Sequence, residues 1–583
     1  MPSATNYAED LTREKRDRYL TSLLLSSLIS SLALLDTHVL RSSSVPTPDQ
    51  NPGPVFDPAH FGGVSHSRLS RRQALGLFGA VGASGLLAAC GGSATGGGGA
   101  PKKGGQLTIV RAQDSVTMNN TMIFANSSIW VFQQIFETLF ISAPDGKGIT
   151  PWLAKSYTSS ADKKTWTFKL RSDVRFSTGQ PMTSADVKFS IDAASATKGG
   201  WEFINSSIKE VTAPDPYTVV ITTKYPWAPL LADLACFSNA VLPKNYGGKS
   251  SAQFYAAPVG TGPFVWDTWT KGSALTLKKN PTYWQPGKPS LDSVTWKVVP
   301  DDNTRNVMIQ GGQADINENP PYSSLDQLRA SNGVGVELFP STRTDYLIIN
   351  HTKKPFDDVH VRRAISYAID REALVKSVLY NNGKAANSLF MPTVAYYDPK
   401  TPGLQYDIAK AKQELAKSSV PNGFTTTYLA SSGDSTDGAI AQILQASLKQ
   451  LGITLKIQNS DPSALNDLQQ KLNYEISHSY WTMDIADPDE LVQFAVDPTS
   501  GGHSFNTGYN NANVVKWAHE AQRTFATTKR QQLYSQIQAQ AAEDAFMAFL
   551  YYQPFPYAVR SAVKGFQVYP TGNYHLADVS LTG

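Results

Sequence analysis

The chain contains few cysteines and almost no excess charge. Only two cysteines, Cys90 and Cys236, occur in 583 residues. The formal net charge is +4, and the 52 lysines and arginines are scattered along the chain instead of gathered in runs. A nucleic-acid partner is therefore not indicated. Cys236 stands in the apolar context of residues 234–237, which favours a buried small hydrophobe over a reactive thiol.

The clearest apolar run is too short to cross a membrane. Residues 74–89 fall below the roughly 20 apolar residues that a membrane-spanning helix needs. The run follows Arg71 and Arg72 and ends in Leu-Ala-Ala before Cys90, so the segment combines a charge pair, an apolar stretch and small residues at a cleavage site. We interpret residues 64–89 as a twin-arginine lipoprotein signal peptide and Cys90 as the lipidation site.

Lipid on Cys90 would anchor the mature protein to the outer face of the cytoplasmic membrane. Cys236 would then be the only thiol in the mature chain, so an internal disulfide is excluded. The glycine-rich residues 90–104 predict a flexible tether. Residues 1–63 do not fit the interpretation as an exported lipoprotein, because a twin-arginine signal normally has only a short region before its arginines. We expect a misassigned or disordered N-terminal extension, with translation starting near Val64.

Motifs of common hydrolases are missing. The sequence has no Gly-x-Ser-x-Gly elbow, and the Ser-x-x-Lys matches at Ser195 and Ser206 lack their companion motifs. His519-Glu520 is not followed by a histidine at the fourth position, so it predicts no zinc-binding helix. We therefore expect no enzyme, no cofactor and no metal site, with an exported hydrolase as the less favoured alternative.

Strand-like and helix-like patterns alternate along the mature chain. Removing the first 104 residues leaves roughly 480, too many for one hydrophobic core. Residues 165–171 show the period-two alternation of a half-buried strand. Helical spacing is clearest at residues 361–379, 408–418, 439–451 and 529–545. This pattern favours α/β lobes.

Short sequence blocks extend, in order, over nearly all of the mature chain. They are residues 152–157, 166–171, 174–176, 185–190, 215–220, 258–264, 280–284, 312–316, 355–362, 368–371, 445–453 and 506–509. Together these blocks resemble the extracytoplasmic solute-binding proteins of the peptide and nickel (oligopeptide and dipeptide) ABC-importer family.

The resemblance implies an α/β fold of two lobes that close about a hinge, with an additional small domain on the first lobe. It places lobe I at 105–145, 257–344 and 555–583, the inserted subdomain at 146–256 and lobe II at 345–554. Such a monomer would capture a small extracellular solute, with a peptide favoured, between its lobes and deliver it to permease subunits in the membrane.

One segment of the second lobe resembles the ligand-contacting segment of oligopeptide binders. In residues 478–484, Trp481 precedes by three positions Asp484, which matches the aspartate that receives the α-ammonium of a peptide in that family. A buried carboxylate is costly unless it is paired, so it would select a cationic group on the ligand. Oligopeptide binders have an arginine where this chain has His478, which leaves the length and even the identity of a peptide open.

Other residues are candidates for ligand contact. Tyr480 lies in the same segment, Tyr346 at the entrance to the second lobe, and Trp130 after a polar loop. For Tyr346 and Trp130, packing is favoured over ligand contact. Asp484 could instead cap a helix or lie on the surface. The resemblance also implies alternative solutes, because pockets of this family accept an oligosaccharide, an opine-like compound or a metal chelate. Tyr480 and Trp481 could stack on a sugar as readily as flank a peptide.

Overall fold

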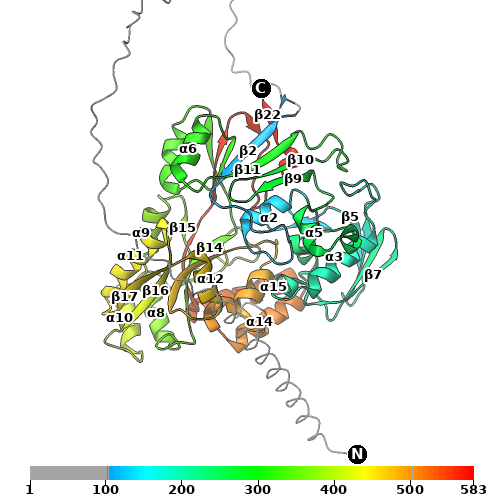
Figure 1. Cartoon of the computed structure of the whole chain (residues 1–583). Helices are drawn as coiled ribbons and strands as arrows, with labels where there is room; N and C mark the ends of the chain where they lie inside the picture. Colours follow the sequence, from blue (N-terminus) through cyan, green and yellow to red (C-terminus); the bar gives the residue numbers. More distant parts are fainter. Residues whose placement is uncertain (1–100, 103, 500–503, 583) are drawn as a thin grey trace, which may run out of the picture. The chain divides into compact units, whose positions relative to one another are not determined.

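The structure is a computed structural model that describes residues 101–102, 104–499 and 504–582 (Figure 1). These residues belong to one compact unit, 94–583. The N-terminal extension, the export signal with Arg71 and Arg72, and Cys90 lie outside the described residues. No helix within the described ranges is long and apolar enough to cross a membrane.

The first lobe is built on a seven-stranded sheet with the order β13–β20–β12–β2–β11–β10–β9. β2 is parallel to its neighbours β11 and β12, and the other pairs are antiparallel. The chain leaves this sheet after β2 and again after β13, and returns both times. The strands are β2 (Gln106–Arg111), β9 (Phe264–Thr270), β10 (Ala274–Lys279), β11 (Ser293–Val298), β12 (Ile316–Glu318), β13 (Val334–Phe339) and β20 (Phe555–Arg560).

Short helices and a small C-terminal sheet complete the first lobe. The helices are α2 (Asn126–Phe132), α6 (Asp302–Gln310) and α7 (Leu325–Arg329). The small sheet has the order β1–β22–β21, with β1 (Pro101–Lys102), β21 (Val563–Lys564) and β22 (Ser580–Thr582). The C-terminal strands therefore return beside the start of the described chain.

The inserted subdomain contains an antiparallel four-stranded sheet with the order β5–β6–β8–β7. The predicted strand at 165–171 is confirmed as β6, in which Trp166, Phe168 and Leu170 are buried and alternate with less buried residues. The elements are β3 (Phe140–Ser142), β4 (Ile149–Pro151), β5 (Ala154–Ser159), β6 (Thr165–Leu170), α3 (Ser184–Ala196), β7 (Ile208–Asp215), β8 (Thr218–Thr223), α4 (Leu230–Asp233) and α5 (Ser251–Ala256).

The second lobe contains a six-stranded mixed sheet with the order β15–β19–β14–β18–β16–β17. Its strands are β14 (Arg343–Ile349), β15 (Lys384–Ala385), β16 (Thr425–Ser431), β17 (Thr454–Ser460), β18 (Ile476–Thr482) and β19 (Met547–Tyr552). Its helices are α8 (Val359–Tyr367), α9 (Arg371–Val378), α10 (Ile408–Ala416), α11 (Ser435–Lys449), α12 (Pro462–Gln470), α13 (Asp489–Val496), α14 (Ala512–Arg523) and α15 (Thr527–Glu543). β14 starts at Arg343, inside the segment predicted for the first lobe.

The single helix predicted at 361–379 is wrong in one respect, because the segment forms two helices, α8 and α9. Asp370 ends the run between them, since its carboxylate accepts a hydrogen bond from Ala373 N at 2.9 Å and caps α9. Arg371 then donates Nε to Phe549 O at 2.6 Å, which fixes the start of α9 against β19. The other three predicted helices are present as α10, α11 and α15.

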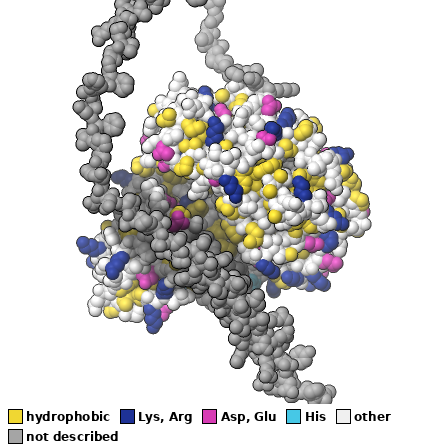
Figure 2. All heavy atoms as spheres, in the orientation of Figure 1, with side chains coloured by type: hydrophobic (Ala, Val, Ile, Leu, Met, Phe, Trp, Pro, Cys, Tyr) yellow, Lys and Arg dark blue, Asp and Glu magenta, His cyan; other side chains and the backbone are white. Residues whose placement is uncertain are grey.

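Charged side chains are interspersed on the surface. On the face that Figure 2 shows, lysines and arginines alternate with aspartates and glutamates over the described part of the chain. This distribution agrees with the scattered charge of the sequence.

A buried carboxylate joins the first lobe to the inserted subdomain. Glu137 is 7% exposed and accepts hydrogen bonds from Trp152 Nε1 at 2.8 Å, Tyr283 Oη at 2.9 Å, Thr261 Oγ1 at 2.7 Å and Trp284 Nε1 at 3.0 Å. Burial raises the pKa of Glu137 despite these four donors. The sequence blocks that contain these residues therefore meet at one structural carboxylate.

Replacing Glu137 with glutamine should destabilise the protein by about 1–3 kcal/mol, because the new NH₂ group would face donors that need an acceptor. Urea denaturation followed by tryptophan fluorescence measures the change. The matched control is Glu337→Gln, at an exposed position on β13, which should shift stability by less than about 0.5 kcal/mol. Equal denaturation midpoints for the two variants would contradict the role of Glu137.

Candidate functional site

A large cavity lies between the first lobe, the inserted subdomain and the second lobe. Its volume is about 1910 Å³. The first lobe contributes Arg111 and Glu318, the last residues of the parallel neighbours β2 and β12. In open α/β sheets, ligands bind beyond the carboxyl ends of such strands. The subdomain contributes Trp201 and Trp227, and the second lobe contributes the segment of β18.

Aromatic side chains meet across one side of this cavity. The ring centroids of Trp201, from the subdomain, and Trp481, from the second lobe, lie 6.5 Å apart. Phe203 and Phe124 lie 5.7 Å and 6.3 Å from Phe494 of the second lobe. Aromatic pairs at these distances attract one another. These contacts join the first lobe and its subdomain to the second lobe, and they therefore favour a closed arrangement of the lobes.

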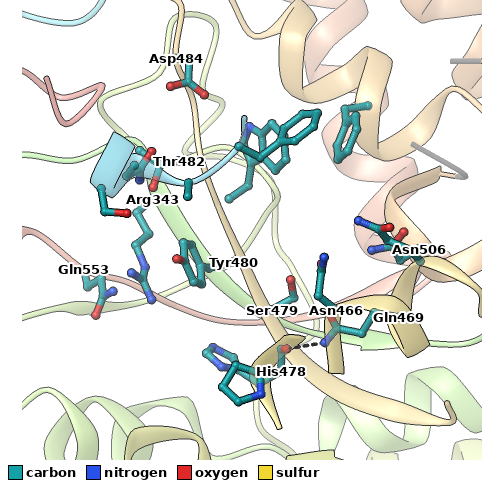
Figure 3. A pocket seen from close by; sticks show the side chains of 18 of the residues that line it. Arg343, Asn466, Gln469, His478, Ser479, Tyr480, Thr482, Asp484, Asn506 and Gln553 are labelled. Carbon is teal, nitrogen blue, oxygen red and sulfur yellow. Dashed lines mark hydrogen bonds between the residues drawn. The ribbon is translucent and has the colours of Figure 1, made fainter. Parts of the chain in front are cut away.

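The strands β14 and β18 place the polar groups of the second lobe (Figure 3). They are antiparallel, with Arg343 opposite Thr482 and Asp345 opposite Tyr480. Directly opposite residues lie on the same face of a sheet, so these four side chains share one face. Asp484 follows two residues after Thr482, just beyond the end of β18.

Asp484 lines the cavity and lacks a cationic neighbour. Its carboxylate makes no hydrogen bond or ion pair with any of the residues that the structure describes. Burial and the negative charge of Glu490 raise the pKa of Asp484 well above its usual value. The alternative that Asp484 caps a helix is wrong, because Pro488 is the N-cap residue of α13. The arrangement leaves room for a positively charged group of a ligand.

Glu490 is the residue that fixes this part of the wall, and the sequence reasoning missed it. It is fully buried and accepts hydrogen bonds from Trp481 Nε1 at 2.9 Å, Asp484 N at 2.9 Å and Ile485 N at 3.0 Å. Burial raises the pKa of Glu490 to about 7. One carboxyl group thus orients both the predicted tryptophan and the predicted aspartate.

A second polar cluster surrounds Asp345, which the sequence reasoning also missed. Arg343 donates Nε and Nη2 to the two oxygens of Asp345 at 2.9 and 2.8 Å, and His478 Nε2 donates at 3.1 Å. Burial alone would raise the pKa of Asp345, but the charge and hydrogen bonds of Arg343 and His478 hold it below its usual value. The central carbon of the guanidinium lies 3.6 Å from the ring centroid of Tyr480.

The remaining predicted contacts have different positions. Tyr346 does not line the cavity, which corrects its prediction as a ligand contact: it is fully buried in the core of the second lobe. Successive residues of a strand point to opposite faces, so Tyr346 faces away from Asp345 and Arg343. Trp130 is 3% exposed and packs against Phe555 with a centroid distance of 5.8 Å, although its ring reaches the cavity wall.

Four of the six predicted contact residues come together in the second-lobe wall of the cavity: His478, Tyr480, Trp481 and Asp484. Tyr480 is the most accessible of them, with 45% of its surface exposed. A wall with a stacking ring, a fixed indole and a carboxylate can hold a solute and position its charge.

Two lobes around a large cavity with polar groups from both define a solute-binding protein. The chain belongs to the bacterial extracellular solute-binding proteins of family 5, whose middle-region family model matches residues 148–503. Its relatives are binding proteins of transport systems and not enzymes, so the chain is a substrate-binding protein of an ABC importer.

Two relatives and one solved structure illustrate this membership. DdpA of Escherichia coli K12, described as a probable D,D-dipeptide-binding periplasmic protein, is 31% identical over 477 residues, which is 80% of this chain and 92% of DdpA. The glutathione-binding protein GsiB of the same strain is 31% identical over 442 residues, 74% of this chain and 85% of GsiB. The ABC transporter-associated periplasmic binding protein DppA of Helicobacter pylori, in complex with the peptide STSA, has a TM-score of 0.75 at 28% identity. That match covers 83% of this chain and 99% of DppA.

Glu490 should make the stability of the protein depend on pH. Its folded pKa of about 7 lies above the ordinary value of 4.5, so the folded state binds more protons between these values. This contribution to the free energy of unfolding is fully present below pH 4.5 and is lost as pH rises through 7. The stability of wild type relative to Glu490→Gln should therefore fall by on the order of 2 kcal/mol between pH 5 and 7.5. Urea denaturation at both pH values measures it; a constant difference would contradict the buried proton.

Proposed function

We propose that this protein is the solute-binding lipoprotein of a peptide importer, which captures a peptide between its lobes and delivers it to the permease. The observation that carries the proposal is Asp484, a half-buried cavity carboxylate whose side chain has no cationic partner among the described residues. A peptide α-ammonium supplies such a partner, and the charge-assisted hydrogen bond that forms is stronger than one between neutral groups. Trp481, fixed by Glu490, stands beside this position.

The relatives support a peptide as the solute. DdpA is named for D,D-dipeptides, GsiB for glutathione, and DppA of Helicobacter pylori was solved with the peptide STSA. The cavity of about 1910 Å³ has room for a ligand of several residues. Mass spectrometry of small molecules released from the protein purified from its native host identifies the solute directly. Recovery of sugars, opines or metal chelates instead of peptides would contradict the proposal.

Replacing Asp484 with asparagine should weaken binding of the released peptide by about 2–5 kcal/mol, because the ammonium would lose its charged partner. Isothermal titration calorimetry measures the affinity. The matched control is Asp467→Asn, a cavity-lining aspartate that already pairs with Lys471 at 2.8 Å and should leave the affinity unchanged. An equal affinity for the Asp484 variant and wild type would remove Asp484 from the site.

The affinity should also depend on pH through Asp484. The empty site favours the protonated carboxyl because burial and Glu490 raise its pKa, and the ammonium of the ligand requires the ionised form. Binding therefore releases a proton, and the affinity of wild type should rise from about pH 5 to about pH 7.5, below the pKa of the peptide amine. In calorimetric titrations over this pH range, the affinity of the Asp484→Asn variant should not increase with pH. A pH-independent wild-type affinity would contradict the proposed pairing.

The membrane attachment is proposed from the sequence motif alone. Arg71 and Arg72 would direct export, and acylation of Cys90 would hold the receptor beside its permease, which raises the effective concentration of captured solute. Replacing Cys90 with alanine should move the protein from the membrane fraction to the soluble or secreted fraction. Cell fractionation with immunoblotting measures the distribution, with Cys236→Ala as the matched control. Membrane retention of the Cys90 variant would contradict lipidation.

A further inference from the structure

The inserted subdomain contacts the second lobe at a second place, besides the aromatic contact of Trp201 with Trp481. The chain enters and leaves the subdomain from the first lobe, and it passes between the two lobes at residues 340–342 and 553–554. In Figure 1, α14 and α15 of the second lobe lie next to the subdomain. Because Glu137 holds the subdomain to the first lobe, this contact must break when the lobes separate.

The subdomain completes the C-terminal end of α14. The last carbonyl groups of a helix have no partner inside the helix. At the end of α14, Thr524 Oγ1 donates to Glu520 O at 2.7 Å. The backbone N–H of Ala228 donates to Gln522 O, also at 2.7 Å. Ala228 belongs to the subdomain, so one terminal carbonyl of this helix is satisfied by a donor from the other side of the junction.

The sequence around Ala228 holds this donor in place. Pro226 precedes it by two residues, and Pro229 follows it directly as the N-cap of α4. Proline fixes its own φ, and the residue before a proline is kept out of the helical region. The N–H of Ala228 is therefore presented on a stiff loop, and little conformational freedom is lost when it binds the carbonyl.

Two side chains beside Gln522 extend the contact. The central carbon of the Arg523 guanidinium lies 4.5 Å from the ring centroid of Tyr225 in the subdomain. The ring of Phe525 stacks on Trp166 of β6, with a centroid distance of 6.2 Å and an angle of 29° between the planes. Trp166 and Phe525 are not among the residues that line the cavity. Their stacking therefore stabilises the junction without forming part of the solute site.

We propose that Gln522, Arg523 and Phe525 form a latch that fastens the inserted subdomain to the second lobe and stabilises the closed arrangement in the absence of solute. When the latch opens, the hydrogen bond of Gln522 O is exchanged for water and both ring contacts are lost, so opening costs free energy even when the cavity is empty. The latch therefore lowers the population of the open form by a factor that does not depend on the proposed solute.

Hydrogen exchange of the Ala228 amide tests the latch. Mass spectrometry on the full chain without added solute measures the rate, and this amide exchanges only when its bond to Gln522 opens. Pro226 and Pro229 carry no amide hydrogen, so a proteolytic fragment that covers the loop contains few amides besides that of Ala228.

Two variants weaken the latch from the side of the second lobe. Phe525→Ala removes the stacked ring, and Arg523→Gln removes the cation over Tyr225. The matched control is Tyr406→Ala, another aromatic residue of the second lobe, which is 46% exposed where Phe525 is 38% exposed.

Each latch variant should exchange the Ala228 amide about two- to tenfold faster than wild type, the range expected from the loss of one ring contact. Tyr406→Ala should keep the wild-type rate. Amides of β8, in the subdomain sheet, should exchange equally in all four proteins because the subdomain stays folded. If the Ala228 amide is unprotected in wild type, or if both latch variants keep the wild-type rate, the latch is wrong. Neither result bears on the proposed peptide binding, because no solute takes part in the measurement.

Discussion

The antiparallel pairing of β14 with β18 determines what the second lobe presents to the cavity. The register sets Arg343 opposite Thr482 and Asp345 opposite Tyr480, so four polar or aromatic side chains share one face. A shift of one residue would turn these side chains to the other face of the sheet, where Thr344 and Tyr346 are buried. The position of Asp484 follows from the same pairing, because it stands two residues past the end of β18.

Three carboxyl groups of the second lobe then have different roles: Asp345 and Glu490 are fully buried, and Asp484 is half-buried. Asp345 is compensated by Arg343 and His478, and Glu490 by three hydrogen-bond donors and a raised pKa. Asp484 has neither a cation nor a donor among the described residues, and Glu490 repels it. Burial of a carboxylate is costly unless it is paired, so under the proposed peptide binding Asp484 would be the group that selects a ligand charge.

Local patterns predicted the elements better than the site. The alternation of Trp166, Phe168 and Leu170 is enough to predict β6. Every second residue of a strand faces the same side, so burial of one side is visible in a short stretch of sequence. Trp481 and Asp484 were found because they lie three positions apart in one segment. Asp345 was missed because its contact with His478 depends on pairing with a strand more than 130 residues away. Tyr346 was placed wrongly because a single position along β14 decides between cavity and core.

Under the proposed peptide binding, Glu490 would couple the charge of the ligand to closure of the lobes. The same carboxyl group holds the indole of Trp481, which meets Trp201 of the subdomain, and the backbone of Asp484. When the lobes separate, water can hydrate Asp484 and the lack of a cation costs little; when they close, that solvation is lost. A ligand ammonium therefore interacts more favourably with the closed form than with the open one. Such a difference in affinity is what shifts a population of two conformations, so a solute without a cationic group would occupy the cavity and still favour closure less.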